Sequence, residues 1–124
     1  MQRSGLTVLV LLSGMLAAGS LAALAHVNDR GMDYSRYRGF QGIPCCDQTD
    51  CHAASDFVEG TDEHRQAVVR LLVNGEWITA PRYMVVREDA TDGRAHWCGY
   101  KVMVGTSGQW RPAHRCVILP PRTT

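Results

Sequence analysis

The chain has 124 residues, with 13 Lys plus Arg against 12 Asp plus Glu and a formal net charge of +1. This length allows a single domain. The basic residues are interspersed with carboxylates and form no basic stripe, which argues against a protein that binds nucleic acid or an anionic membrane surface.

The first 25 residues have the features of a secretory signal. Arg3 supplies a positive charge, residues 6–16 are apolar, and Ala23-Leu24-Ala25 forms an A-x-A cleavage site. We expect cleavage before His26, no stable membrane insertion afterwards, and a periplasmic or secreted protein. The alternative is an uncleaved anchor, because the uncharged run over residues 4–25 is just long enough to span a bilayer.

Residues 26–44 predict an irregular N-terminal arm. Glycines separate the aromatic residues there, and the apolar positions follow neither the period of a strand nor that of a helix. We expect the aromatic side chains of this arm to lie across the domain that follows. That domain spans residues 45–121, and residues 122–124 form a short tail.

The middle of the chain predicts a β-hairpin. Asn74-Gly75 separates the β-prone runs 68–73 and 76–79, and such a pair is the strongest local signal for a tight hairpin turn. Residues 83–87 are a candidate for a further strand. Asp62-Glu63 is a candidate start of a short helix, although the β-branched residues that follow favour a strand.

The last part of the chain predicts two more strands, one over residues 95–104 and one formed by Trp110 and the run 115–119, with a loop over residues 105–109 between them. If these two strands form a hairpin centred on Ser107, Cys98 lies opposite Cys116. The predicted fold class is therefore small all-β and disulfide-stapled, either barrel-like or a sandwich of two sheets, with at most a short helix besides the signal.

Export into an oxidising compartment makes disulfides the expected state of the five cysteines, which are Cys45, Cys46, Cys51, Cys98 and Cys116. We expect two disulfides from the first three to the last two, and each would contribute roughly 4 kcal/mol in the chain-entropy model. A direct bond between Cys98 and Cys116 stays open as the other scheme. The odd cysteine stays a thiol, binds a metal, or bridges to another molecule, including a second copy.

Histidines beside these cysteines suggest a metal site as the alternative. His96 and His114 each precede a cysteine by two residues, so alternation along a strand puts each His-x-Cys pair on one face. Such pairs can bind Zn²⁺ or Cu⁺. After signal cleavage, the α-amine and imidazole of His26 would suit Cu²⁺, together with a second histidine. The candidate ligands are Cys51, His52, His96, Cys98, His114, Cys116 and, separately, His26 with His52, His64, His96 or His114.

The sequence contains no recognisable catalytic constellation. Cys45 and Cys46 are adjacent instead of being spaced as Cys-x-x-Cys, and Asp47 and Asp50 disfavour a thiolate nearby, which argues against a thiol oxidoreductase. Ser107 lacks the Gly-x-Ser-x-Gly frame of a hydrolase nucleophile. We therefore expect a protein that is not an enzyme and needs no cofactor.

The cysteine framework resembles that of a family of small exported bacterial proteins without an assigned activity. The resemblance rests on Cys45-Cys46-x4-Cys51 with Asp50 before its last cysteine, on Asp92-Gly93-x-x-His96-x-Cys98, and on Cys116-x3-Pro120-Pro121. The stretch between Cys98 and Cys116 is longer and less polar than in the family. The resemblance implies export and the cysteine framework, and it implies no catalytic or binding residue.

The predicted function is that of an exported, disulfide-stabilised binding or structural module whose partner is unknown. Trp77, Trp97 and Trp110 are expected in the core, with an exposed aromatic surface for a partner as the alternative. The competing functional hypothesis is a metal-binding protein of the cell envelope.

Overall fold

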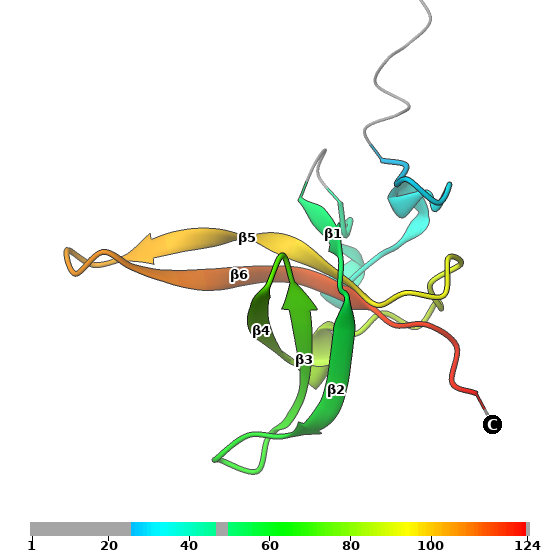
Figure 1. Cartoon of the computed structure of the whole chain (residues 1–124). Helices are drawn as coiled ribbons and strands as arrows, with labels where there is room; N and C mark the ends of the chain where they lie inside the picture. The colour runs from blue at the N-terminus through cyan, green and yellow to red at the C-terminus, as the bar shows by residue number, and fades with distance from the viewer. Residues whose placement is uncertain (1–25, 47–49, 124) are drawn as a thin grey trace, which may run out of the picture.

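The computed structural model describes residues 26–46 and 50–123, so the predicted signal and its cleavage site lie outside the described residues. The chain forms two antiparallel three-stranded sheets, ordered β1-β5-β6 and β2-β3-β4 (Figure 1). This confirms the prediction of a small all-β fold. The strands are β1 (Cys51–Ala53), β2 (Asp56–Thr61), β3 (Ala67–Val73), β4 (Glu76–Pro81), β5 (His96–Val104) and β6 (Gln109–Ile118).

The predicted hairpin in the middle of the chain is confirmed as β3 and β4, with Val73 paired to Glu76. Asn74 and Gly75 between them have φ angles of 51° and 79°. Two consecutive left-handed residues form the tight turn that matches the twist of antiparallel strands, and Asn-Gly is the pair that adopts it most readily.

Of the two alternatives after Asp62, the strand is confirmed as β3 and the helix is wrong, and the candidate strand over residues 83–87 is wrong as well. No helix starts near Asp62, because its carboxylate accepts hydrogen bonds from the backbone N–H groups of His64 and Gln66 and closes a turn between β2 and β3. Residues 83–87 form no strand. Pro81 ends β4, and the chain continues as a 3₁₀ turn, η4 (Arg82–Met84).

The two predicted C-terminal strands are confirmed as β5 and β6. They pair as a hairpin, and Cys98 is the register partner of Cys116. The register shifts just beyond this pair, so Gly99 faces His114 and Arg115 is an extra residue in β6. A bulge reverses the alternation of side chains. The expectation that His114 shares a face with Cys116 is therefore wrong.

Two hydrophobic cores hold the molecule together. The first lies between the two sheets and contains Ala54, Val69, Leu71, Val73, Ile78, Ala80, Ala95, Trp97 and Val117. The second lies beneath the N-terminal arm, which contains the 3₁₀ turns η2 (Tyr34–Arg36) and η3 (Phe40–Gly42). This second core contains Met32, Tyr34, Tyr37, Cys45, Cys46, Ala90, Cys98, Cys116 and Ile118.

The arm approaches β6 closely at Gly39. A Cβ atom on this residue would lie 2.9 Å from the carbonyl oxygen of Arg115 and 3.0 Å from the Sγ atom of Cys116. Only glycine allows the two backbones to come so near without a shift. The arm is thus packed against the C-terminal strand, although it contains no strand of its own.

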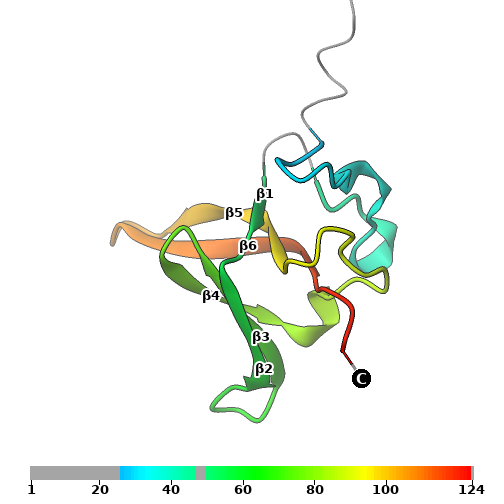
Figure 2. The same cartoon turned by 45° about the vertical axis from the view of Figure 1, so that its right-hand side comes forward.

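The far half of the β5–β6 hairpin extends away from both cores. Figures 1 and 2 show these two strands continuing past the end of β4 as a two-stranded ribbon. We call residues 100–112 the projecting hairpin. All thirteen of these residues are exposed to solvent.

Candidate functional site

Both disulfides run from the cysteine cluster to the last two strands. Cys45 is bonded to Cys116, and Cys51 is bonded to Cys98. The prediction of a disulfide-bonded domain is confirmed, and the direct bond between Cys98 and Cys116 is not formed. The first disulfide fastens the N-terminal arm to β6, and the second fastens β1 to β5.

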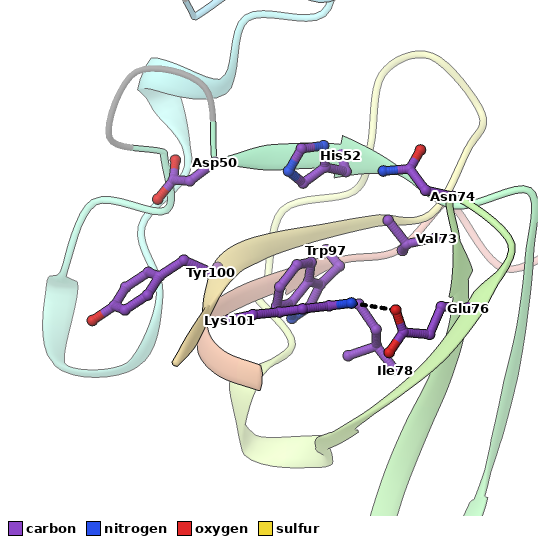
Figure 3. Close-up of a pocket in the computed structure, with 10 residues that line it drawn as sticks. Asp50, His52, Val73, Asn74, Glu76, Ile78, Trp97, Tyr100 and Lys101 are labelled. Atoms are coloured by element: carbon purple, nitrogen blue, oxygen red, sulfur yellow. Dashed lines mark hydrogen bonds and ion pairs between the residues drawn. The ribbon is translucent and has the colours of Figure 1, made fainter. Parts of the chain in front are cut away.

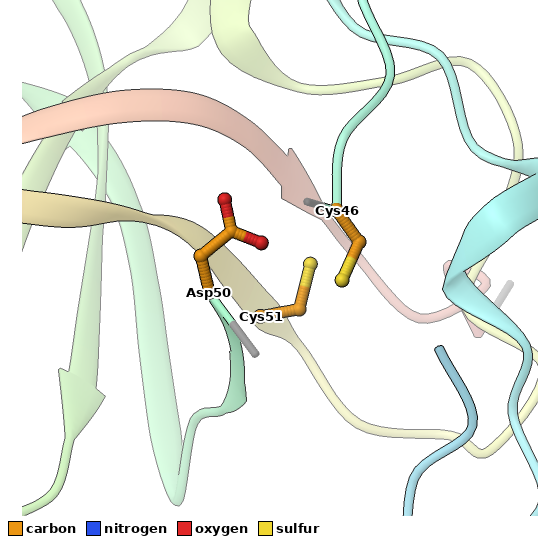
Figure 4. Close-up of side chains that lie close together, drawn as sticks. All are labelled: Cys46, Asp50 and Cys51. Carbon is orange, nitrogen blue, oxygen red and sulfur yellow. The ribbon is translucent and has the colours of Figure 1, made fainter. Parts of the chain in front are cut away.

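Cys46 takes part in neither disulfide and is buried. Its sulfur, the Cys51 sulfur and an Asp50 carboxylate oxygen lie within 4.8 Å of one another (Figure 4). Burial and a hydrogen bond to Asp50 raise the pKa of the Cys46 thiol to about 11. The thiol is therefore protonated at neutral pH, and a protonated thiol is a poor nucleophile and a poor metal ligand.

The structure does not bring the other predicted metal ligands together. Among the described residues, Cys46, Asp50 and Cys51 are the only group of three close metal-ligating side chains. His52 stacks near Trp97, with ring centroids 6.2 Å apart, and His114 accepts a hydrogen bond from the indole N–H of Trp97 at 3.0 Å. His26 lies in the N-terminal arm, and its Nδ1 atom is buried without a described hydrogen-bond partner.

His96 is completely buried and belongs to a polar network beneath the N-terminal arm. Its Nδ1 atom lies 2.8 Å from the Tyr34 hydroxyl, and its Nε2 atom lies 2.8 Å from a carboxylate oxygen of Asp92. The other carboxylate oxygen accepts hydrogen bonds from Asn28 at 2.8 Å and from Arg94 at 3.1 Å. The network joins the arm to the loop before β5.

The hydrogen bonds and pKa shifts of this network fit a neutral His96. Burial lowers the pKa of His96, even though Asp92 favours the charged form. Burial alone would raise the pKa of Asp92, but the hydrogen bonds from His96, Arg94 and Asn28 outweigh it and lower the pKa to about 2. A neutral imidazole that donates from Nε2 to Asp92 and accepts the Tyr34 proton at Nδ1 satisfies every partner. This is a structural role for His96.

A cavity of about 370 Å³ lies where β1 and β5 meet the turn between β3 and β4. In Figure 3, Trp97 lies behind the Lys101 side chain, which crosses the cavity to form an ion pair with Glu76. His52 and Asp50 line the side towards β1, and Tyr100 points away from Trp97. Since the indole of Trp97 is buried and Lys101 covers it, the cavity offers no open aromatic platform to a ligand.

The projecting hairpin carries most of the large apolar side chains that β5 and β6 expose. The exposed fractions are 54% for Tyr100, 55% for Met103 and 60% for Trp110, and Val102 and Val104 are exposed as well. Trp77 of β4 is also exposed and stacks with Arg70. The expectation that the tryptophans lie in the core is thus correct for Trp97 and wrong for Trp77 and Trp110.

Charge is unevenly distributed along the chain in a way that the sequence analysis missed. Residues 93–124 contain no acidic side chain. They contain five cations: Arg94, Lys101, Arg111, Arg115 and Arg122. Carboxylates from elsewhere contact two of the cations in the hairpin, since Glu76 pairs with Lys101 and Asp50 pairs with Arg115. A count of acidic residues in the last quarter of the sequence would have found this pattern.

No family model, curated protein or solved structure matches this chain. The family that its cysteine framework resembles therefore stays a proposal. In the part of the chain that the structure describes, no helix is long and apolar enough to cross a membrane.

Proposed function

We propose that this protein is an exported, disulfide-stapled binding module, and that the projecting hairpin is the surface with which it binds another protein. The proposal rests on one observation above all. Large apolar side chains gather on a ribbon that neither core covers, and Tyr100, Met103 and Trp110 are each more than half exposed.

Tyr100, Val102 and Val104 form an apolar row on one face of the ribbon, and the register partners Met103 and Trp110 lie on the other face. Soluble monomers rarely expose contiguous apolar surface of this kind unless a partner binds there. Tryptophan, tyrosine and methionine are also the side chains enriched in protein interfaces. The two disulfides support the proposed export, since such bonds persist in oxidising compartments. They fasten the base of the hairpin and leave its far half bare.

Site-specific photo-crosslinking in cells that export the protein tests this function. A benzophenone amino acid would replace Trp110 in one variant and Tyr83 in a matched control. Tyr83 is equally exposed, at 61%, but lies in η4 on the body of the domain. We expect a discrete adduct with another protein from position 110 and none from position 83. Equal adducts from both positions, or none from position 110, would contradict the proposal.

The metal-binding alternative is favoured by one observation, the proximity of Cys46, Asp50 and Cys51 (Figure 4). It requires reduction of the bond between Cys51 and Cys98, because the sulfur of Cys51 must be a thiolate to serve as a Zn²⁺ ligand. An intact mass of the exported protein, alkylated without reductant and paired with a native mass, separates the two functions. A binding module shows one alkylated thiol and no metal, whereas a metal protein shows at least three thiols and a stoichiometric metal.

A further inference from the structure

The outer edge of β5 is a continuous row of backbone hydrogen-bonding groups. β1 covers the first part of this edge, at residues 96–98. The ladder continues by one bond, from the N–H of Gly99 to the carbonyl oxygen of Asp50 at 2.9 Å. Beyond that bond, no strand within the described residues pairs with the outer edge of residues 100–104.

The bond from Gly99 shows which groups point outward. Successive residues of a strand direct their N–H and C=O groups to opposite edges, so Lys101 and Met103 point the same way as Gly99. Tyr100, Val102 and Val104 point inward to β6, where they pair with Ala113, Arg111 and Gln109. The edge therefore offers two outward residues in line with β1.

The edge of β6 is less suitable for an added strand. Pro112 has no N–H to donate, and prolines on edge strands discourage pairing. The bulge at Arg115 breaks the ladder further along. Of the two edges of the projecting hairpin, only that of β5 carries regular donors and acceptors.

We propose, on the basis of the proposed function, that this edge of β5 accepts an extended, acidic and apolar segment of a partner protein as an added strand. Strand addition supplies affinity through the main chain, and the alternating side chains supply specificity. An isolated two-stranded ribbon is only marginally stable in water, so a third strand stabilises the projecting hairpin as well.

The side chains specify the character of this segment. On one face, Tyr100, Val102 and Val104 form an apolar row, which favours β-branched or aromatic partners opposite them. On the other face, Lys101 lies beside Met103. Glu76 already pairs with Lys101, so the ribbon's positive charge without a described carboxylate partner is that of Arg111, which favours glutamate or aspartate on the added strand.

A second copy and a lipid surface fit less well. Two β5 edges that pair with each other would bring two like-charged ribbons together, because Glu76 pairs with Lys101 but Arg111 has no described carboxylate partner in either copy. The tip of the hairpin, Gly105 to Gln109, contains no large apolar residue, so it has nothing to insert into a bilayer. The apolar side chains lie along the stem, where a polypeptide strand would contact them.

The test measures fluorescence anisotropy of labelled peptides with the oxidised, exported protein. The probe is a peptide of about eight residues that alternates glutamate and valine, the length of an ordinary strand. We expect saturable binding that falls by about tenfold or more in the K101E/R111E variant and weakens with salt. The R36E/R87E variant makes the same charge change at exposed positions on the body and should bind as the parent does. A lysine–valine peptide should not bind.

A second variant tests the backbone part of the proposal. Met103→Pro removes an outward N–H group without changing the charge, and the inward bonds of Val102 and Val104 to β6 remain. We expect it to lose binding while it keeps both disulfides. The inference would be overturned if the K101E/R111E variant bound the glutamate–valine peptide as well as the R36E/R87E variant does. It would also be overturned if the parent protein bound the lysine–valine peptide as well as the glutamate–valine peptide.

Other outcomes would identify a different occupant and would also overturn it. If the peptide does not bind, a concentration-dependent dimer in sedimentation would identify a second copy as the occupant. Co-sedimentation with phosphatidylglycerol vesicles, again without peptide binding, would identify a lipid surface. If the peptide fails while Trp110 still forms its crosslink in cells, strand addition is wrong and the binding function stands. If both fail, the function is wrong too.

Discussion

At the scale of single residues, the buried network around His96 couples folding to pH. His96 is neutral in the folded protein because burial lowers its pKa, and burial lowers the pKa of His114 as well. The unfolded chain takes up protons at histidine as the pH falls through about 6.5, before the folded protein does. Protons that bind the unfolded state but not the folded state stabilise the unfolded state, so the free energy of unfolding falls.

We therefore predict that the free energy of unfolding by urea falls as the pH is lowered below about 6.5. A second loss begins below about pH 4, because Asp92 must be protonated and its folded pKa is about 2. His96→Gln should be less stable at neutral pH but should lose less stability on acidification. His64→Gln, which replaces an exposed histidine, is the control and should keep the parent curve. A curve that is flat from pH 7 to pH 5 in the parent would contradict this account.

Gly99 provides a prediction about packing at the bulge. A Cβ atom there would collide with the carbonyl oxygen of Ala113 and would lie 2.7 Å from the ring of Trp97. We predict that Gly99→Ala lowers the free energy of unfolding by about 1–3 kcal/mol, the usual cost of overpacking. Gly60→Ala in β2 is the matched control, because a Cβ atom there meets nothing within 4 Å. Equal urea midpoints for the two variants would show that the bulge can adjust.

At the scale of elements, local signals predicted the β3–β4 hairpin and the two C-terminal strands, and missed what depends on distant contacts. Asn74-Gly75 specifies its turn through its own backbone preferences, so the β3–β4 hairpin was predictable. β2 was not, because it is an edge strand with almost every residue exposed and shows no alternation. The bulge at Arg115 left no local signal either, and it separates His114 from Cys116.

The disulfide pairing depends on the same distant contacts. The register of β5 and β6 was predictable from a loop centred on Ser107, and it places Cys98 opposite Cys116. Each of these cysteines nevertheless bonds to the N-terminal cluster, because β1 and the arm pack against the pair. The spacing of cysteines in the sequence does not show how the N-terminal arm packs against the β1-β5-β6 sheet. The sequence therefore left the disulfide pairing open.

The candidate site was predictable only in part. The sequence identified Asp92, His96 and the tryptophans as residues of interest, but the partner of His96 is Tyr34, which lies 62 positions earlier in the arm. Exposure of Trp110 follows from the length of the last hairpin relative to the body, which periodicity does not reveal. The absence of acidic residues after Asp92 was readable from the sequence.

At the scale of the whole molecule, the protein combines a cross-linked body with one exposed ribbon. Both disulfides and both cores lie at the base of β5 and β6, and the projecting hairpin contributes no residue to either core. The disulfides fasten the base of the ribbon to the body. This division of roles supports the central claim, which is the proposal that a partner protein binds the projecting hairpin.

Hydrogen–deuterium exchange of the oxidised protein, with and without the glutamate–valine peptide, tests this claim most directly. The account predicts new protection at the amides of Lys101 and Met103, whose N–H groups point outward, and unchanged exchange in β2, β3 and β4. New protection in β2, β3 or β4, or none in the projecting hairpin, would contradict it.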